Sequence, residues 1–445
     1  MAFKYEEVVN YIEMKIKEDL KGRRPLPSVR ELAEKFQCTR DTALRAYREL
    51  MLNNRAYAVP HKGYFAVTDS LPVSLDKKLI DMATAAPDSR VLPYREFQSC
   101  LNQAVERYKR SLFTYEATQG LPGLRQIVRE WLAGEQIYCA DEQLFITAGT
   151  QQALQLLSLI SFPADKDLFV VEQPTYAGML GVLRMQNICV AGVTRTAQGL
   201  EMDKLEEYFS SRRVRYFYTC PRFQHPLGTS LDRQERKALV RLAKRYDVYI
   251  IEDDYLGDLA GRRFESSLYY EDMGERVVYL RSFSKTLLPG LRLGAAVLPK
   301  KLAQKFADAK HWADLGASVL SQGALEIYMR CGMHQEHRRK IRRFYAEKCR
   351  FLRRLTQEKF DDKAVWHVPE NGFFACVEVK EEGNMRGVVE FLRSTSLRIK
   401  EPDSAYLPNY HDKQLLLSIC FSTLGTAELT AGVQLLKAGI FHLQE

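Results

Sequence analysis

The chain has 445 residues, of which 46% are hydrophobic and 27% charged, and its formal net charge at pH 7 is +9. This length exceeds that of one ordinary domain, the composition excludes a disordered or fibrous chain, and no apolar run reaches the roughly 18–20 residues of a membrane span. Nine scattered cysteines without a C-x-x-C pair argue against a zinc cage or a disulfide framework, so we expect a cytoplasmic protein of at least two domains with no metal site and no membrane partner.

The first 67 residues carry 13 Lys and Arg against 9 Asp and Glu, a modest positive excess that solvated helices alone would also explain. Their pattern is more informative than their charge, because apolar residues recur first at helical spacing and then in alternation. The predicted elements are a helix over 5–20, a helix capped by Ser28 with Glu31 at the capping-box position, a helix capped by Thr39, and two strands over 55–59 and 63–67. Three helices followed by a hairpin predict a winged helix-turn-helix domain over residues 1–67.

In such a domain the helix that begins after Thr39 would be the recognition helix. Its first turn presents N–H groups and short hydroxyls to phosphates, and Arg40 and Arg45 are long enough to reach guanine edges in the major groove of double-stranded DNA. The residues predicted to contact DNA are Ser28, Arg30, Thr39, Arg40, Thr42, Arg45, Lys62 and Gly63. The alternative is a protein-binding module, in which Ser28 and Thr39 are only helix caps.

Residues 68–75 are rich in turn formers and predict a short linker to a larger unit over 76–445. In that unit short apolar runs alternate with helical stretches, which predicts an α/β fold with a mostly parallel sheet covered by helices on both faces. The predicted strands are 143–147, 168–172, 188–193, 216–219, 248–252, 277–280 and 294–298, with helices such as 151–161 and 232–246 between them. A long charged helix is expected near 301–358, within a smaller α+β lobe over about 301–445.

Polar motifs follow several of these strands, where open α/β sheets place their ligands. The turn around Thr150 and Gln151 precedes a helix and is suited to an anion, although many such turns contain Gly and Thr for geometry alone. Lys285 stands between the hydroxyls of Ser284 and Thr286, with an arginine seven residues later. A lysine amine that condenses with an aldehyde needs a lowered pKa, which burial and nearby positive charge provide. A surface lysine is the alternative.

The run from Glu252 to Asp254 clusters acids at another strand end, which fits either a carboxylate that keeps a pyridine nitrogen protonated or a Mg²⁺ site. Tyr176 follows a fourth strand and could stack on a flat ring. Gln224 and His225 follow a fifth and offer polar groups to a ring oxygen, although a single histidine is more often an ordinary loop residue.

Together these motifs resemble fold type I, aminotransferase-like enzymes that use pyridoxal 5'-phosphate, over roughly residues 76–445. The head resembles the GntR-type winged helix-turn-helix in its Leu26-Pro27-Ser28-Val29-Arg30-Glu31-Leu32-Ala33, Thr39-Arg40-Asp41-Thr42 and His61-Lys62-Gly63-Tyr64-Phe65 segments. The fusion of the two is similar to MocR-type transcriptional regulators. That resemblance implies a homodimer that binds operator DNA and pyridoxal phosphate together with a small effector.

The resemblance also implies roles for individual residues. Lys285 would hold the cofactor covalently, Asp253 would face its pyridine nitrogen, and Tyr255 would bind its ring oxygen; these three are the candidate catalytic residues. The remaining residues implied in cofactor binding are Thr150, Gln151, Tyr176, Gln224, His225, Ser282, Ser284, Arg292 and Tyr115. Of these, Tyr115 would reach the phosphate of the cofactor in the partner subunit.

Two positions depart from the family pattern. His225 stands where working aminotransferases commonly have asparagine, and Ser418 stands where an arginine normally binds the substrate carboxylate. Arg90, Arg184 and Arg222 are candidate substitutes for that arginine. These departures predict poor transamination of ordinary α-amino acids and favour a regulator that senses pyridoxal phosphate or an amine, with a possible link to vitamin B6 or amino-compound metabolism. An active aminotransferase with an accessory DNA-binding head is the alternative.

Overall fold

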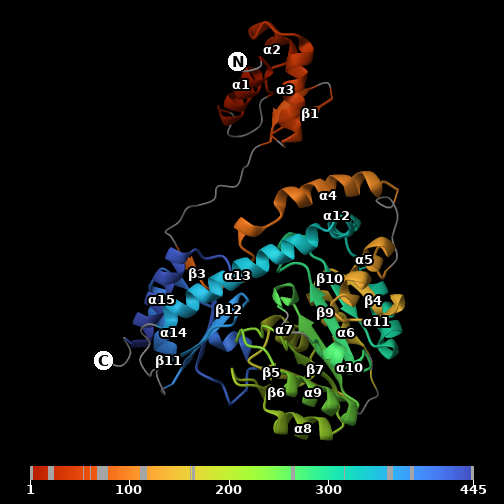
Figure 1. The fold of residues 1–445 in the computed structure, drawn as a ribbon, viewed down its shortest axis with the longest axis vertical. Coiled ribbons are helices and arrows are strands. Elements are labelled where there is room, and N and C mark those ends of the chain that lie inside the picture. The colour runs from red at the N-terminus through yellow and green to blue at the C-terminus, as the bar shows by residue number, and fades with distance from the viewer. Residues whose placement is uncertain are drawn as a thin grey trace. The chain divides into compact units, whose positions relative to one another are not determined.

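The computed structural model of the chain describes residues 4–18, 25–53, 55–60, 62–67, 79–110, 118–160, 162, 166–261, 266–314, 316–357, 364–380 and 385–441. The chain forms two compact units, Met1–Lys77 and Lys78–Glu445, and Figure 1 labels most of their helices and strands. The predicted linker over 68–75 lies outside the described residues. Within the described ranges, every helix is too short or too polar to cross a lipid bilayer.

The N-terminal unit consists of three helices and a two-stranded hairpin in the predicted order. These elements are α1 (Lys4–Glu18), α2 (Val29–Lys35), α3 (Arg40–Leu52), β1 (Ala56–Val59) and β2 (Gly63–Ala66). Val8 and Ile12 of α1, Leu32 of α2 and Leu50 of α3 are buried together in one core. The helical spacing of apolar residues in the sequence therefore marks the faces that the three helices bury.

Hydrogen bonds fix where these helices begin and how the hairpin is attached. Ser28 Oγ accepts the N–H of Glu31 at 3.2 Å while the Glu31 carboxylate accepts the N–H of Ser28 at 2.7 Å, which is the predicted capping box. The Tyr47 hydroxyl of α3 donates to the Pro27 carbonyl, and its ring stacks on Tyr64 of β2 with centroids 3.7 Å apart. Tyr47 thus joins α3 to the segment before α2 and to the hairpin.

The larger unit is built on a seven-stranded sheet with the strand order β4-β10-β9-β8-β7-β5-β6. Its strands are β4 (Leu144–Thr147), β5 (Leu168–Gln173), β6 (Cys189–Thr194), β7 (Val214–Thr219), β8 (Tyr249–Asp254), β9 (Val277–Ser282) and β10 (Gly294–Val297). Neighbouring strands are parallel except for β10, which is antiparallel to β4 and β9, so the prediction of a mostly parallel sheet is confirmed. The short connection from β9 to β10 contains no crossover helix, and an antiparallel pair needs none.

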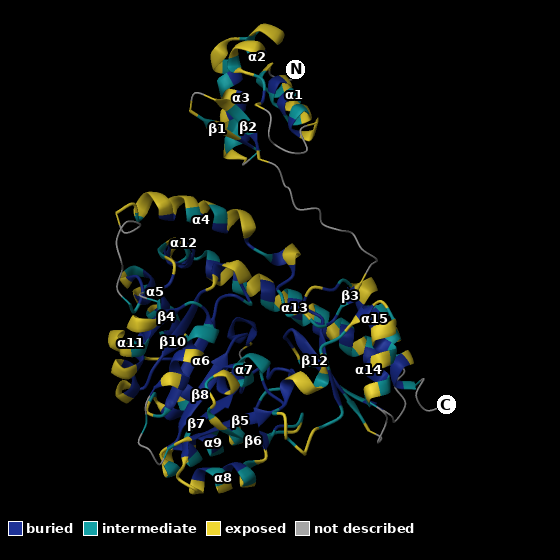
Figure 2. Ribbon diagram, turned by 180° about the vertical axis from the view of Figure 1, so that it is seen from behind, coloured by how far each residue is buried: buried dark blue, intermediate teal, exposed yellow. Residues whose placement is uncertain are grey.

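Helices cover both faces of this sheet, and the strands between them are buried, as Figure 2 shows. Successive residues of β8 face opposite sides: Ile250 lies in one hydrophobic cluster and Ile251 in the other. Helices α4 (Tyr94–Arg107), α5 (Pro122–Ala133), α8 (Met202–Ser210), α9 (Arg233–Tyr246), α10 (Leu268–Asp272) and α12 (Val319–Arg330) contribute to the first cluster. Helices α6 (Thr150–Leu159), α7 (Ala177–Met185) and α11 (Lys300–Asp314) contribute to the second.

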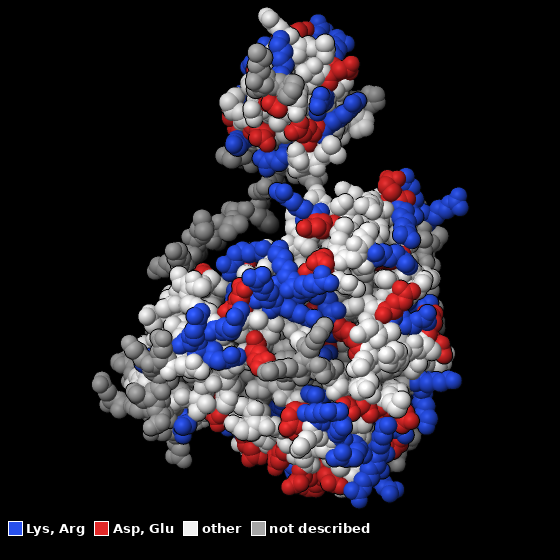
Figure 3. All heavy atoms as spheres, in the orientation of Figure 1, with Lys and Arg blue, Asp and Glu red and all other residues white. Residues whose placement is uncertain are grey.

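The predicted single helix near 301–358 is wrong, because the structure divides this stretch into α11, α12 and α13 (Met333–Gln357). Gly316 and Gly332 separate them with φ values of +143° and +74°, which an α-helix does not contain. On the visible face, Lys and Arg side chains gather over α13 (Figure 3). Its exposed basic residues are Arg339, Lys340, Arg343, Arg350 and Arg354.

The C-terminal part of the chain forms a smaller α+β layer. An antiparallel sheet of β11 (Ala364–His367), β12 (Phe374–Val379) and β14 (Leu416–Cys420) packs against α14 (Met385–Ser394) and α15 (Thr426–Phe441). The pair β13 (Leu397–Arg398) and β3 (Ile80–Asp81) is parallel. The residues that follow β3 run beside the end of β14, where Cys420 donates its N–H to Met82 and Ser422, just after the strand, donates its hydroxyl to Ala86.

Candidate functional site

Lys285 lies in the loop after β9, at the same sheet edge as the ends of β5, β7 and β8. Its Nζ donates a hydrogen bond of 2.7 Å to the carbonyl of Ala85. Burial lowers the pKa of Lys285, and the nearby Arg292 guanidinium lowers it further, while Cys420 and Asp253 oppose the shift. A lysine amine with a lowered pKa is neutral for more of the time and can attack a carbonyl carbon.

Asp253 is the last residue but one of β8, and its buried carboxylate faces the Lys285 side of the sheet. Its Oδ2 accepts a 2.9 Å hydrogen bond from the Tyr218 hydroxyl, whereas its Oδ1 has no partner among the described residues. Burial raises the pKa of Asp253 to about 7, against the lowering effect of Tyr218. Sequence reasoning missed Tyr218; the pairing of Tyr218 with Ile251 in neighbouring parallel strands is the register that brings its hydroxyl to Asp253.

Tyr176 and Tyr255, two aromatic residues of the predicted site, lie within the electrostatic reach of this carboxylate. The Tyr176 ring meets the His225 ring edge-on with centroids 5.9 Å apart, and the Tyr176 hydroxyl donates to Gln151 Oε1 at 3.1 Å. The Tyr255 hydroxyl donates to the Phe223 carbonyl at 2.6 Å. Burial raises the pKa values of both tyrosines, and the negative charge of Asp253 raises them further.

Gln224 and His225 form a buried turn between β7 and the C-terminal layer. The Gln224 amide donates to the Pro174 carbonyl at 2.7 Å and accepts the N–H of Leu227 at 3.0 Å, so its side chain holds the turn together. His225 lies edge-on to Phe374, with centroids 4.6 Å apart, and its Nδ1 is buried without a partner in the described part of the chain. Burial, with repulsion from Lys400 and Lys285, lowers the pKa of His225 to about 3, so the ring is neutral.

The start of α6 is the turn that the sequence predicts to bind an anion. Gly149 is the N-cap at φ +79°, and a Cβ built there would lie 3.3 Å from Nη2 of Arg292, so the guanidinium faces the helix N-terminus. Ser284 Oγ is buried without a partner among the described residues, and Ser282 Oγ accepts the N–H of Ser284 at 3.2 Å. Free N–H groups, a guanidinium and a hydroxyl are the donors that phosphate prefers.

The remaining predicted phosphate contacts differ in their present partners. Thr150 is the first residue of α6 and is half-buried. The Gln151 side chain accepts from Tyr176 and donates to the Gly178 carbonyl at 3.2 Å, so its hydrogen bonds lie within the protein. Tyr115 lies outside the described residues.

Three buried side-chain atoms of this site, Asp253 Oδ1, His225 Nδ1 and Ser284 Oγ, have no hydrogen-bond partner within the described ranges. Each such atom costs roughly 1–3 kcal/mol unless something pairs with it. Asp253 Oδ1 can accept the pyridine N–H of pyridoxal 5'-phosphate. The His225 ring nitrogen matches its ring oxygen, the Ser284 hydroxyl matches its phosphate, and the Lys285 amine belongs to the same site. The residues present therefore fit this cofactor.

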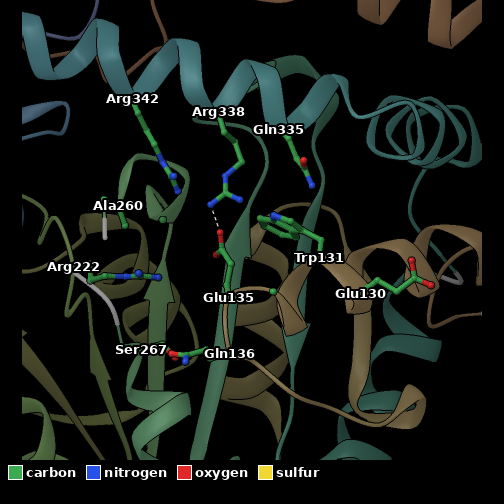
Figure 4. A pocket seen from close by; sticks show the side chains of 13 residues that line it. Glu130, Trp131, Glu135, Gln136, Arg222, Ala260, Ser267, Gln335, Arg338 and Arg342 are labelled. Atoms are coloured by element: carbon green, nitrogen blue, oxygen red, sulfur yellow. Dashed lines mark hydrogen bonds and ion pairs between the residues drawn. The ribbon is translucent and has the colours of Figure 1, made fainter. Parts of the chain in front are cut away.

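Asp254, the next residue of β8, faces the opposite side of the sheet and belongs to a separate ion network. It pairs with Arg222 and Arg281, and Arg281 also reaches Asp258 at 2.9 Å. Figure 4 shows Arg222, Arg338 and Arg342 around the adjoining cavity of about 580 Å³. The acid cluster is thus divided by the sheet: Asp253 serves the Lys285 side and Asp254 neutralises arginines behind it.

Ser418 lies on β14, and its hydroxyl donates to the Pro226 carbonyl at 3.1 Å. None of the three predicted substitute arginines lines the small pocket beside it. Arg222 pairs with Asp254, Arg90 pairs with Asp88 at 2.6 Å, and Arg184 is exposed in the last turn of α7.

In the N-terminal unit, α3 presents exposed arginines. Arg40 and Arg45 are both exposed, and the Arg45 guanidinium lies 4.3 Å above the Tyr5 ring. Thr39 Oγ1 accepts the N–H of Thr42 at 3.2 Å and lies 2.9 Å from the Thr42 hydroxyl. Ser28 and Thr39 therefore act as caps, whichever partner the surface binds.

The other predicted contacts lie on α2 and the hairpin. Arg30 is exposed on α2 and forms an ion pair of 3.0 Å with Glu34. Lys62 is exposed at the tip of the hairpin beside Gly63, whose φ is +99°. These side chains, with those of α3, are accessible to a large partner.

Comparison with known proteins places this chain in a family. Residues 77–402 match the family model of aminotransferase class I and II. An uncharacterized HTH-type transcriptional regulator of Bacillus subtilis, YcxD, is 39% identical over 93% of this chain and 94% of its own length. The HTH-type transcriptional regulator NorG of Staphylococcus aureus is 26% identical over 79% of this chain and 78% of its own length.

Solved structures agree with this assignment. The kynurenine aminotransferase of Pyrococcus horikoshii, in complex with PMP, superposes with a TM-score of 0.76 at 26% identity over 83% of this chain and 92% of that one. LysN, the α-aminoadipate aminotransferase of Thermus thermophilus, complexed with N-(5'-phosphopyridoxyl)-L-leucine, gives a TM-score of 0.74 at 26% identity over 83% and 93%. The chain therefore belongs to the aminotransferase class I and II family and, with its relative of 39% identity, to the HTH-type transcriptional regulators that contain such a domain.

Proposed function

We propose that this protein is a dimeric transcriptional regulator that binds operator DNA through its N-terminal unit and senses an amine-type ligand, or the cofactor itself, at Lys285. The observation that carries the proposal is one chain that combines exposed arginines on a capped helix α3 with a buried site fitted to pyridoxal phosphate. The similarity to an HTH-type regulator over 93% of the chain supports the combination.

Pyridoxal phosphate is the cofactor that the family implies, and in such a site it withdraws electrons from an amine bound to it. Lys285 would hold it covalently, Asp253 would pair with its pyridine N–H through Oδ1, and Arg292 with Ser284 and the start of α6 would bind its phosphate. Tyr255, neutral His225 and the Tyr176 ring would surround the rest of the ring.

The protein residues prepare this site before anything binds. Burial keeps His225 neutral, so its unpaired Nδ1 is available for a hydrogen bond. Tyr218 holds one oxygen of Asp253 and leaves the other free. Gln224 and the Phe223 carbonyl fix the turn that carries His225. These contacts orient the site rather than react in it.

On the DNA side, Arg40 and Arg45 of α3 would reach base edges in the major groove while Arg30, Thr42 and Lys62 contact phosphates. Tyr115, if it reaches the phosphate site of the partner subunit as in related enzymes, makes the site depend on a dimer. A dimer carries two heads, which raises their effective concentration on paired half-sites.

Ser418 favours regulation over turnover. A buried carboxylate needs a paired cation, and the one hydroxyl hydrogen of Ser418 is already donated to Pro226. The intact set of Lys285, Asp253 and Tyr255 keeps the active aminotransferase as the second candidate, because these residues would support transamination if a substrate were held. A link to vitamin B6 supply would follow if the cofactor is itself the signal.

Visible absorbance tests the cofactor part of the proposal. The purified protein mixed with pyridoxal phosphate should be yellow after desalting and lose the colour with borohydride, which reduces the bond between Lys285 and the cofactor. Lys285→Ala should retain none of the borohydride-sensitive band. Lys301→Ala, which removes an exposed lysine of α11, is the matched control and should behave as the native chain. A native protein that takes up no cofactor would refute the assignment.

A further inference from the structure

The cavity of about 580 Å³ on the Asp254 side of the main sheet is a second candidate site, separate from Lys285. Its walls are the end of α5, the segments that follow β7 and β8, and the first half of α13. Its volume lies within the roughly 300–1,000 Å³ of cavities that hold small-molecule ligands. Among the described residues, its lining contains none of those assigned to the cofactor.

Arginines dominate the charge of this cavity. The charged residues of its lining, within the described part of the chain, are Arg222, Arg338, Arg342, Glu130 and Glu135. Figure 4 shows Arg338 and Arg342 extending from α13 into the cavity, with Arg222 on another wall. The Glu130 side chain points away from them, and its carboxylate accepts a side-chain amide one turn earlier on α5 at 2.9 Å. The cavity therefore presents mainly guanidinium groups to a ligand.

Ion pairs within the protein account for Arg222 and Arg338 but not for Arg342. Arg222 pairs with Asp254, and Arg338 pairs with Asp258 at 3.0 Å. Arg342 donates its Nε to the Asp258 carbonyl at 2.6 Å and forms no ion pair with any residue that the structure describes. Burial, together with repulsion from the Arg338 guanidinium, lowers the pKa of Arg342 to about 10. A half-buried cation beside another cation gains more from an incoming anion than an exposed cation does, because water solvates it less well.

The outer side of α13 adds positive charge next to the cavity. Arg339, Lys340 and Arg343 are exposed beside the two lining arginines of this helix, on the face where Figure 3 shows Lys and Arg side chains gathered. A cleft whose surroundings carry one sign of charge raises the local concentration of ions of the opposite sign. The planar guanidinium group binds carboxylate and phosphate through two parallel hydrogen bonds. The ligand that suits this cavity is therefore an anion.

We propose that this cavity binds a small organic anion that carries phosphate groups or several carboxylates, and that Arg342 is the residue that pairs with it. The volume has room for more than a single inorganic ion, which is why the anion is an organic one. Arg338 and Gln335 would border the anion on α13, and Trp131 would form the wall at the end of α5. The inference does not depend on the proposed function, because Lys285 takes no part in it.

Isothermal titration calorimetry of the full-length, cofactor-loaded protein tests the inference, with pyrophosphate and citrate as probes at constant ionic strength. Pyrophosphate represents ligands with phosphate groups and citrate those with several carboxylates. We expect at least one probe to bind with a saturable isotherm, and Arg342→Met to weaken that binding about tenfold or more. Gln335→Glu should also weaken it, because it adds a negative charge at an exposed lining position that has no side-chain role in the fold among the described contacts.

Arg343→Met is the matched control. Arg343 follows Arg342 on α13 and is exposed, its carboxylate partner is Glu347 at 3.1 Å, and it does not line the cavity, so the same charge is removed outside the site. This variant should bind the probe as the native protein does. Failure of both probes to bind the native protein at millimolar concentration would overturn the inference. Binding that survives Arg342→Met and Gln335→Glu, or equal losses in Arg342→Met and Arg343→Met, would overturn it as well.

Discussion

Asp253 is the residue at which folding and ligand binding make opposite demands. It is buried, with one unpaired oxygen, and burial raises its pKa to about 7 from an ordinary value near 3.8. When folding raises the pKa of an acid, the folded state holds the proton more tightly than the unfolded state does. The acid therefore contributes its full stability below its unfolded-state pKa, and this contribution is lost as the pH rises through the folded-state pKa. Burial outweighs the attraction of Lys285, so the ionised carboxylate weakens the fold, and a pyridine N–H would relieve that cost.

Asp253→Asn should separate these two demands. In the cofactor-free protein the native chain should lose up to about 4 kcal/mol of unfolding free energy between pH 4 and pH 7 that the variant keeps. Urea denaturation at the two pH values measures this difference. In the loaded protein the variant should bind pyridoxal phosphate about 10- to 100-fold more weakly, because a charge-assisted hydrogen bond is lost. Equal pH dependence of both chains would contradict the shifted pKa of Asp253.

Single residues also show which parts of the site a sequence can reveal. Lys285, Asp253 and Tyr255 were predicted because each follows a recognisable strand, and parallel strands end at a shared edge. Tyr218, Ala85 and Lys400 were not, because their proximity depends on strand register and on segments that lie far apart in the chain. The sequence shows which functional groups these residues carry, but it does not show which residues lie next to them in the fold.

Among the elements, α3 carries the DNA-binding prediction. Capping by Thr39 fixes its first turn, and Tyr47 holds it against the hairpin. Capping and apolar spacing are local signals, which is why the N-terminal elements follow their predicted order closely. The prediction of a single helix after residue 300 was wrong because the charge pattern of this stretch is continuous. The breaks between its helices depend instead on two glycines with positive φ.

Arg40→Ala should lower operator affinity by about 1–3 kcal/mol if its guanidinium reads a base, and relax the preference at one base position only. Lys15→Ala removes the same charge from α1, where the side chain pairs with Glu18, and serves as the control. Fluorescence anisotropy with singly substituted operators measures both variants. Similar losses for the two would show that α3 does not read the sequence.

Tyr47→Phe probes how α3 is anchored. Loss of the hydroxyl leaves the Pro27 carbonyl without this donor while the ring can still stack on Tyr64, so we expect about 1 kcal/mol of lost stability in the N-terminal unit and weaker operator binding. Thermal unfolding followed by circular dichroism gives the first quantity and anisotropy gives the second. An unchanged midpoint would mean that the stack alone orients α3.

At the scale of the whole molecule, regulation requires that occupancy at Lys285 changes the affinity of the heads for DNA. A ligand shifts such an equilibrium only if it binds two states of the protein with different affinity. The C-terminal layer supplies walls of the small pocket beside Ser418, and β3 joins the start of the larger unit to that layer through β13. Movement of this layer would therefore reach the segment that leads to the head.

The most direct test of the proposed function is an anisotropy titration of DNA from the region upstream of the protein's own gene, at several salt concentrations. It compares cofactor-free protein, cofactor-loaded protein and Lys285→Ala mixed with pyridoxal phosphate. We predict a salt-sensitive complex whose affinity differs several-fold between the first two forms, with Lys285→Ala behaving as the cofactor-free form. The absence of any salt-sensitive complex, or identical affinity in all three forms, would contradict a DNA-binding regulator controlled at Lys285.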